Sequence, residues 1–596
     1  MMSVRLLLLA LAAHACHGVT VQITNHWNGG FQGEVCIPIT IELNGWKAHL
    51  LFSLDVDSVE VWAATATKVT PREFVLQNKD YNAIAHVGER LCFTFLGHGT
   101  GDIVPETTVY IEGMEDGPGV TNPTTRPPTA PPNTGSGTGK KDYASALAKS
   151  IQFYYAQRSG KLPADNPIPW RGDSALDDCV PGGWYDAGDH VKFGLPMAST
   201  TTVLVWSLLR FKDGYVKADQ LDAMYDTVKW PLDYFLRAWN PQAQQLVVQV
   251  GDADADHSFW GRPEDMNMAR PCQTVSASHK GSDVAAETAA ALAAGAVAFK
   301  DKGDTVYSAR LLTAAEGLYS FAKSNRGLFH GAVPFYASSG DRDELCIASA
   351  WLYRATRNNQ YLSDAQGFVD NGWAWAFSWD DKKVACQLLM YEESHSANYR
   401  DSVVGFLESW MPNGGITYTP CGLAWRDKWG ANRYAGNAAF LALLASEAGI
   451  HTSKYRTWGV EQINYILGDN RHAGGCFSYQ IGYGSKYPTQ PHHRAASCPD
   501  KPAPCSDAQL TDSGPSPQTL VGAIVGGPEA SDYYFDDRED YILNEVATDY
   551  NSGFQGALAA IVHLEVTNNF PTTNNKCPCQ TRNFFVCTTL KCKNTE

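Results

Sequence analysis

The chain carries two hydrophobic patterns, and the first predicts β-strands. Between residues 19 and 116, apolar and polar positions mostly alternate in short runs separated by turn residues. Alternation puts every second side chain on the same face, which is typical of a β-sandwich. Cys36 and Cys92 lie in two of these runs and could bridge the strands. The predicted strands are residues 19–24, 35–41, 49–54, 59–62 and 91–95.

The second pattern, after residue 142, predicts helices. Apolar residues recur there with a helical period, most clearly in residues 283–299, 435–445 and 545–564. Their side chains are small and almost continuously apolar, so we expect helices buried on most sides, as in the inner ring of a helical barrel. The loops between them hold clusters of Gly, Asp and Trp, and functional sites usually lie in such loops.

A stretch rich in Pro, Thr, Gly and Ser separates the two patterns and predicts an extended linker. Such linkers commonly tether a binding module to a catalytic one, although a passive spacer has the same composition. The chain of 596 residues also exceeds what one hydrophobic core usually serves. The predicted parts are a signal peptide (1–18), a β-sandwich module (19–116), the linker (117–141), a helical domain (142–570) and a Cys-rich C-terminal tail (571–596).

The first 18 residues have the pattern of a secretory signal. Arg5 precedes the apolar run of residues 6–13, and small residues follow at Cys16 and Gly18. This run is too short to cross a bilayer, which takes about 20 apolar residues, so a membrane anchor is disfavoured. We therefore expect a secreted, extracellular protein. The net charge of −16 argues against a nucleic-acid partner, because phosphate binding needs a basic face.

The cysteines indicate disulfide bonds. The chain has 15, and removal of Cys16 with the signal peptide leaves an even number, suited to an oxidising compartment. A zinc cluster is the alternative for the four cysteines near the C-terminus, but their irregular spacing and the lack of a nearby His favour disulfides. The pairing stays open at this point. These four are Cys577, Cys579, Cys587 and Cys592.

Two acidic segments about 350 residues apart carry the candidate chemistry. In residues 182–190, Asp186 and Asp189 stand three apart in a glycine-rich turn. In residues 536–552, Glu545 stands where a polar acidic stretch meets apolar residues. Cleavage of a bond between sugars needs a protonated acid at the leaving oxygen and a carboxylate that activates water, and two such segments can supply that pair. Taken singly, each acid could equally cap a helix or stabilise a turn.

Together these segments resemble glycoside hydrolase family 9, the family of inverting endo-β-1,4-glucanases. The likeness covers about 142–570 and rests on residues 181–193, 491–494 and 534–552. It implies a mainly α protein whose catalytic domain is an (α/α)6 barrel with an open cleft, preceded by the small β-sandwich. It also implies that Asp189 is the general base, that Asp186 helps to hold the water, and that Glu545 is the general acid. Partial burial beside Val546 would raise the pKa of Glu545 and keep it protonated.

The same resemblance implies further site residues. His492 and Arg494 match a substrate-contacting His-X-Arg, although either could brace a loop, and Asp536 is expected to orient the neighbours of the acid. The aromatic side chains in the cleft would stack on sugar rings, with core packing as the alternative. The remaining candidates for substrate binding are His257, Trp260, Tyr336, Trp375, Trp429, Arg433 and Tyr550.

No cofactor is expected for catalysis, but one stretch resembles a structural calcium site of some family members. The implied ligands are hard oxygen donors, which suit Ca²⁺, and solvated surface charge is the alternative. They are the carbonyls of Ser339 and Gly340 and the carboxylates of Asp343, Glu344 and Asp380.

The N-terminal segment resembles a family 2 carbohydrate-binding module. Three exposed aromatic residues form the binding plane in that family, and Trp27, Trp62 and Tyr81 match them, whereas Trp46 matches the core tryptophan. Together the two resemblances imply a secreted, monomeric cellulase that acts on cellulose or a related β-1,4-glucan, with no nucleic acid or membrane as partner. A processive, exo-acting, or lichenan- or glucomannan-preferring relative remains an alternative. So does a polysaccharide-binding protein without catalysis.

Overall fold

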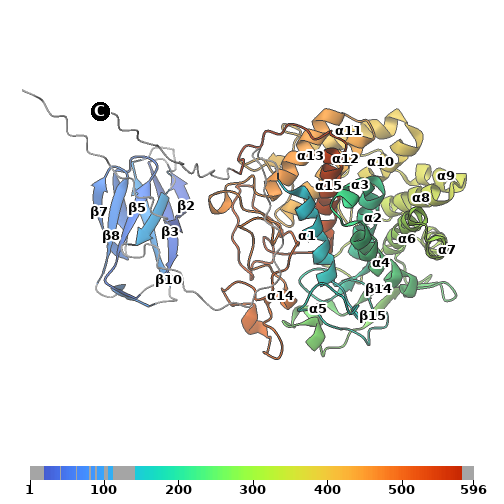
Figure 1. Cartoon of the computed structure of the whole chain (residues 1–596), viewed down its shortest axis with the longest axis horizontal. Coiled ribbons are helices and arrows are strands. Elements are labelled where there is room, and N and C mark those ends of the chain that lie inside the picture. Colours follow the sequence, from blue (N-terminus) through green and yellow to red (C-terminus); the bar gives the residue numbers. More distant parts are fainter. Residues whose placement is uncertain are drawn as a thin grey trace, which may run out of the picture. The chain divides into compact units, whose positions relative to one another are not determined.

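The computed structural model describes residues 19–27, 29–39, 42–61, 63–79, 82–86, 90–99, 105, 107–111 and 141–579 (Figure 1). The chain divides into two compact units, residues 1–135 and 136–596. The first is built from strands and the second mainly from helices, in the order that the two hydrophobic patterns predict.

Two antiparallel sheets make up the N-terminal unit. One has the strand order β1 (Val19–Thr20), β11 (Thr107–Ile111), β5 (Lys47–Phe52), β8 (Glu73–Asn78), β7 (Ala64–Thr70). The other has the order β2 (Gln22–Trp27), β3 (Gly30–Pro38), β10 (Arg90–His98), β6 (Ser58–Val61). A short pair, β4 (Leu43–Asn44) and β9 (Ile84–Ala85), lies outside both sheets. The predicted sandwich is therefore confirmed.

The core of this unit is aromatic. Phe31, Phe52 and Phe95 meet edge to face between the sheets, with ring centroids 5.8 to 6.2 Å apart. Trp46 is buried, as predicted for the core tryptophan. Cys36 and Cys92 are register partners on β3 and β10 and form a disulfide, which confirms the predicted bridge.

Of the three predicted binding aromatics, the structure describes Trp27 alone. It ends β2, is 38% exposed, and meets His98 edge to face at 6.3 Å. Trp62 and Tyr81 lie outside the described residues.

Within residues 141–579, six inner helices alternate with six outer helices. The inner helices are α2 (Gly194–Arg210), α6 (Ser282–Lys302), α8 (Arg342–Thr356), α10 (Lys383–Ser394), α12 (Ala431–Glu447) and α15 (Thr548–Val566). The outer helices are α1 (Tyr143–Ala156), α4 (Leu221–Ala238), α7 (Thr305–Ser324), α9 (Asn359–Phe368), α11 (Ala397–Trp410) and α13 (Thr452–Ile466). Because α15 packs on both α12 and α2, the inner ring closes into the expected barrel.

The inner helices are buried because their side chains are small. In α6, 17 of the residues are buried, mostly alanines that allow neighbouring helices to approach. By length and composition α6 could also cross a membrane, and it is the one such helix among the described residues; 94% of its apolar window is buried inside the protein.

One predicted helix begins later than expected. The pattern suggested a start at Glu545, but α15 begins at Thr548. Glu545 instead lies in extended chain that forms a parallel bridge with His492, and its carbonyl accepts a hydrogen bond from Gly526 N at 2.8 Å. These contacts provide hydrogen-bond partners for the backbone of the segment without a helix. Glu545 therefore projects from extended chain that is held by the loops of His492 and Gly526.

Disulfides connect distant parts of the helical unit, as the cysteine count suggested. The C-terminal segment is tied back to the barrel by two of them, which confirms disulfides for Cys577 and Cys579; Cys587 and Cys592 lie outside the described residues. The bonds found in residues 141–579 are Cys179–Cys272, Cys346–Cys386, Cys421–Cys577, Cys476–Cys579 and Cys498–Cys505.

Both ends of the described helical unit meet at one carboxylate. Lys141 Nζ and the backbone N–H of Cys579 each donate to Asp469 Oδ1, at 2.8 and 2.9 Å. The segment before Cys579 is held as well, since Asn574 N donates to Glu461 Oε1 at 2.8 Å. Residues 571–579, the start of the predicted tail, therefore pack against the barrel.

Candidate active site

The two acidic segments meet through their backbones. Gly188 lies so close to the His492 carbonyl that a Cβ at this position would overlap it, and Arg494 N donates to Gly188 O at 3.0 Å. Thr548 N, three residues after Glu545, donates to Asp186 O at 2.9 Å. The turn with Asp186 and Asp189, the His492 loop and the Glu545 segment thus form one backbone assembly.

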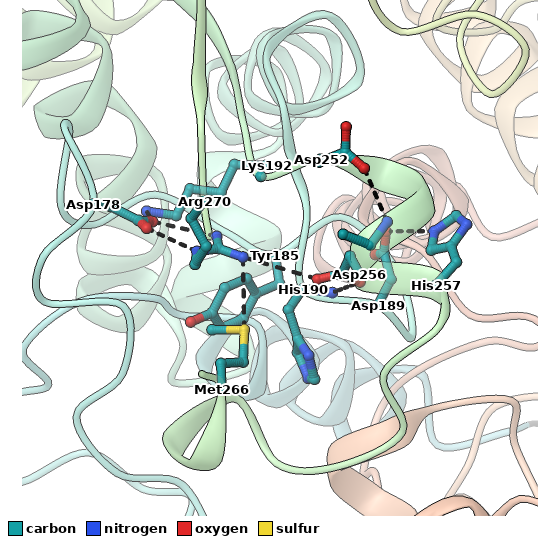
Figure 2. A network of polar contacts seen from close by, with 12 residues as sticks. Asp178, Tyr185, Asp189, His190, Lys192, Asp252, Asp256, His257, Met266 and Arg270 are labelled. Carbon is teal, nitrogen blue, oxygen red and sulfur yellow. Dashed lines mark hydrogen bonds and ion pairs between the residues drawn. The ribbon is translucent and has the colours of Figure 1, made fainter. Parts of the chain in front are cut away.

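Asp189 is buried, yet it is held as a carboxylate. His257 Nε2 lies 3.2 Å from Asp189 Oδ2, and Ala187 N donates to Oδ1 at 3.1 Å (Figure 2). Burial alone would raise the pKa of Asp189, but the hydrogen bond and charge of His257, followed by Arg494 and the Ala187 N–H, outweigh it. The pKa is lowered below its ordinary value, so Asp189 can accept a proton at neutral pH.

Asp186 titrates in the opposite direction. Burial, and then the charges of Asp189 and Asp549, raise its pKa well above the ordinary value, although the hydroxyl of Tyr336 donates to Oδ2. Its other oxygen, Oδ1, is buried without a hydrogen-bond partner in the described part of the chain. A free oxygen next to the base fits the predicted role of holding a water.

Glu545 is held in its protonated form. Trp429 Nε1 donates to Oε2 at 2.5 Å and the Tyr550 hydroxyl at 2.7 Å. Burial is the largest influence on this carboxyl and raises its pKa to about 7, against these two hydrogen bonds. Since both donors use Oε2, Oε1 is the oxygen that can carry the proton. A carboxyl with this pKa can act as a general acid near neutrality.

A neutral histidine stands between the two acidic segments. His492 Nδ1 donates to Arg538 O at 2.7 Å, which leaves Nε2 as the acceptor. Burial lowers the pKa of His492 to about 4, so the ring stays uncharged. The His492 ring packs edge to face against Trp260, with ring centroids 5.2 Å apart. The Arg494 guanidinium lies over the Trp260 ring, 5.2 Å from its centroid. His492 is thus prepared to accept a hydrogen bond from a sugar hydroxyl.

Comparison with known proteins now identifies the helical unit. Residues 143–558 match the model of Glycosyl hydrolase family 9, a match over well more than half of the chain. The chain belongs to glycosyl hydrolase family 9. Residues 17–115 match the Cellulose binding domain family, in agreement with the predicted module.

Relatives of this family 9 chain are named endoglucanases. Endoglucanase B of Cellulomonas fimi and endoglucanase A of Bacillus pumilus are each 44% identical over 449 residues, or 71% of this chain. The aligned part spans 42% and 66% of those two proteins, less than two thirds of either.

Solved structures carry the same fold. An endoglucanase from the termite Nasutitermes takasagoensis is 47% identical, with a TM-score of 0.69, over 71% of this chain and 99% of its own. The endoglucanase CelQ from Clostridium thermocellum, complexed with cellotriose, is 36% identical with a TM-score of 0.65. That alignment covers 74% of this chain and 73% of the solved one.

Arg433, one of the candidates for substrate binding, is buried and braces the surroundings of Glu545. It donates to Asp549 Oδ2 at 2.9 Å and to Trp429 O at 3.1 Å, and it lies 4.8 Å from the Tyr550 ring centroid. It therefore holds both hydrogen-bond donors of Glu545 in place. Asp549, four residues beyond the acid in the same motif, was not predicted as a site residue.

Asp536 braces a loop, in line with its predicted orienting role. Thr489 donates to its Oδ2 from both its N–H and its hydroxyl, at 2.7 and 2.8 Å, and Gln490 N donates to Oδ1 at 3.0 Å. Thr489 and Gln490 lead directly into Pro491 and His492, so Asp536 fixes the entry of the His492 loop.

A second unpredicted acid lies beside Asp189. The ligand atoms of Asp189, Asp256 and His257 all lie within 4.8 Å of one another, the one such group of three in the described ranges. Asp256 Oδ1 accepts from His190 N at 3.0 Å, and burial, then Asp189, raises its pKa to about 6. The sequence signal was its position directly before His257.

Behind Asp256 runs a buried charge network (Figure 2). Arg270 lies 3.8 Å from Asp256 Oδ2 and donates to Asp178 at 2.7 Å, and Asp178 also pairs with Lys192 at 2.7 Å. Four charged groups of alternating sign therefore follow one another behind the turn. Their mutual attraction offsets part of the cost of burying them, and loss of one member would leave its partner as an unpaired buried charge.

The aromatic candidates differ in exposure. Trp375 is 49% exposed and Trp429 43%, so each offers area to a ligand. Trp260 is buried, and its Nε1 donates to Ser497 Oγ at 2.8 Å. The ring held in this way packs against His492 and supports it. Tyr336 uses its hydroxyl on Asp186 and packs against Trp379 at 4.9 Å.

Proposed function

We propose that this family 9 chain is a secreted, monomeric endo-β-1,4-glucanase that hydrolyses internal bonds of cellulose with inversion. The observation that carries the proposal is the opposite displacement of two pKa values. Asp189 is held as a carboxylate by His257, whereas the pKa of Glu545 is raised to about 7. One group is ready to take a proton and the other to give one, as hydrolysis of a glycosidic bond requires.

The residues divide the reaction between them. Glu545 protonates the leaving oxygen through Oε1 while Trp429 and Tyr550 hold Oε2. Asp189 takes a proton from the attacking water, which Asp186 Oδ1 helps to hold. His492 Nε2 accepts a hydrogen bond from a hydroxyl of the sugar.

The relatives support cellulose as the substrate and cleavage of internal bonds as the reaction. Proteins at 44% identity are named endoglucanases, and a solved relative was crystallised with cellotriose. Secretion is supported by the signal-like pattern of residues 1–18 and by the disulfides, which persist in oxidising compartments. The alternatives are processive or exo-acting cleavage, a preference for lichenan or glucomannan, and binding without catalysis.

The product profile over time separates these alternatives. On carboxymethylcellulose and amorphous cellulose we expect a rapid fall in chain length with a range of soluble products. Proton NMR at early times should show the α-anomer first, because an inverting pair, about 6.5–9.5 Å apart, leaves room for water to attack directly. Cellobiose as the sole early product would favour the exo-acting alternative, initial β-anomer would overturn Asp189 as base, and no hydrolysis would favour the binder.

The N-terminal module is proposed to dock the enzyme on insoluble glucan through Trp27, Trp62 and Tyr81. A protein that starts at Lys141 is expected to keep its rate on soluble substrate and to lose adsorption and activity on crystalline cellulose. The Trp27→Ala variant of the full chain should show a partial loss of adsorption, because one of three aromatic contacts is removed. Equal adsorption with and without residues 19–116 would contradict this role.

A structural calcium ion is proposed for the acidic loop around α8. Burial, and then the neighbouring charge of Asp343, raises the pKa of Glu344, and Glu344 Oε2 is buried without a partner in the described residues. Asp380 Oδ1 accepts from Ser339 N at 2.7 Å, which draws a third carboxylate to the loop. Hard oxygen donors, with the carbonyls of Ser339 and Gly340 completing the set, suit Ca²⁺. Lys382 Nζ donates to Glu344 Oε1 at 2.9 Å, and the ligand atoms of the three carboxylates do not all lie within 4.8 Å of one another, so an ion would have to draw them together.

Calcium is therefore expected to raise the melting temperature of the protein, and a chelator to lower it, because an ion that binds the folded state stabilises it. The Asp380→Asn variant should respond less. A melting temperature that is independent of calcium in the unaltered protein would contradict the site.

A further inference from the structure

Trp373 is the most exposed tryptophan in the described part of the chain. Its side chain is 64% exposed, compared with 49% for Trp375 and 43% for Trp429. Burial of apolar area of this size against a ligand is favourable, so the exposed indole offers a contact surface. The family motifs did not draw attention to it, since none of them includes this position.

The ring of Trp373 has a defined seat. A Cβ at Gly405 of α11 would overlap the Trp373 indole, so the ring lies directly on the bare backbone of that helix. One side of the ring is thus covered by α11, and the large exposed fraction belongs to the rest. A seated aromatic ring loses little conformational freedom when it binds a ligand.

The chain on both sides of Trp373 is anchored. Gln387 Nε2 donates to the carbonyl of Gly372 at 2.9 Å, and Ser402 Oγ donates to Asn371 O at 3.3 Å. On the other side, Trp375 N donates to Asp381 Oδ2 at 3.0 Å. The platform is therefore fixed through its backbone as well as through its ring.

Trp373 and Trp375 are both exposed on the same short segment. Burial alternates from Trp373 to Ala376, with both alanines buried and both tryptophans exposed. Trp375 is also covered on one side, since the Arg426 guanidinium lies 4.2 Å from its ring centroid.

A series of direct contacts links Trp375 to Glu545. Trp375 meets Tyr434 edge to face at 5.3 Å, and Arg433 lies 4.3 Å from the Tyr434 ring. Arg433 in turn holds the carbonyl of Trp429, whose Nε1 donates to Glu545. These contacts connect the position of Trp375 to the surroundings of Glu545, and Trp373 stands two residues before Trp375 in the same segment.

We propose that Trp373 is an additional glucan-binding platform, which extends the substrate path beyond Trp375 and favours long chains. The ligand class is a β-1,4-linked glucan, because the flat rows of C–H groups on its sugar faces match an open indole face. The inference rests on the proposed function. It adds a specificity determinant that only a substrate long enough to reach Trp373 can use.

The test compares cello-oligosaccharides of different length on the full chain. The Trp373→Ala variant is expected to raise KM for cellohexaose by about tenfold, as for loss of an aromatic contact worth somewhat over 1 kcal/mol, with kcat little changed. The kinetics on cellotriose should be unchanged. Trp373→Phe keeps a flat ring and should restore most of the affinity.

Gly405→Ala supplies a second test that leaves Trp373 in place. The added methyl group displaces the ring from its seat, so this variant should lose affinity for cellohexaose but not for cellotriose. Val306→Ala, at an apolar site on α7 that is 75% exposed, is the control. Equal KM for cellohexaose in all variants, or an equal effect on every chain length, overturns the proposal. An unaltered protein that hydrolyses no cello-oligosaccharide would instead refute the proposed function.

Discussion

Replacement of Glu545 by Gln is expected to lower kcat by about 10²–10⁴-fold, because general acid catalysis contributes that much. Gln keeps the shape of the side chain, but its amide cannot supply a proton to the leaving oxygen. Trp429 and Tyr550 can still donate to the amide oxygen, so the loop should keep its position. Substrate binding, measured by calorimetry with a cello-oligosaccharide, should therefore be close to that of the unaltered enzyme.

The pH profile gives this prediction a second readout. Glu545 acts in its protonated form, so activity should fall as the pH rises through about 7, where the carboxyl loses its proton. The residual activity of Glu545→Gln should lack that limb. Glu539→Gln, the same change at an exposed carboxylate six residues earlier, is the control and should keep both rate and profile. Near-normal hydrolysis by Glu545→Gln would contradict its assignment as the acid.

Replacement of Asp189 by Asn is the second large effect we expect, again about 10²–10⁴-fold in kcat. The amide can still accept from Ala187 N, but it cannot take a proton from water. The loss should appear across the whole pH range, because the neighbouring Asp256 is already engaged and cannot replace the missing carboxylate. Asp256 Oδ1 accepts from His190 N, and its Oδ2 faces the Arg270 guanidinium.

Asp186→Asn is the matched comparison. Burial and the charge of Asp189 raise the pKa of Asp186 well above its ordinary value, which favours the neutral acid that an amide imitates. The Tyr336 hydroxyl can donate to the amide oxygen as it does to Oδ2. The loss for Asp186→Asn should therefore be clearly smaller than for Asp189→Asn. A reversed order would exchange the roles of the two aspartates.

The parts of the fold that were predictable depend on local periodicity. The alternation in residues 91–95 predicted β10, and the alanine-rich pattern of residues 283–299 predicted α6 nearly to its ends. The start of α15 was missed because apolar spacing continues through Val546 and Ala547. Only the partners of that segment, His492 and Gly526, show that it is extended. Those partners are far away in sequence.

The same limit applies to the site. The candidate acids could be singled out from the sequence because each stands in a long, specific motif. The role of Arg433 as a brace depends on Asp549 and on the Trp429 carbonyl, which motif spacing does not connect to it. The coupling of Asp256 to Asp189 likewise appears only when two loops are folded together. Motifs name the reacting groups, whereas their protonation is decided by contacts across the fold.

Lys141 and Cys579 both bind Asp469, so the two ends of the described helical unit lie close together. Two groups that donate to the same oxygen are close enough to be joined by a short peptide, and such proximity of the two ends of a domain is what circular permutation requires. The order of the twelve helices around the barrel would then have no fixed beginning. Linkers or further modules could be attached at another loop without moving the acid or the base.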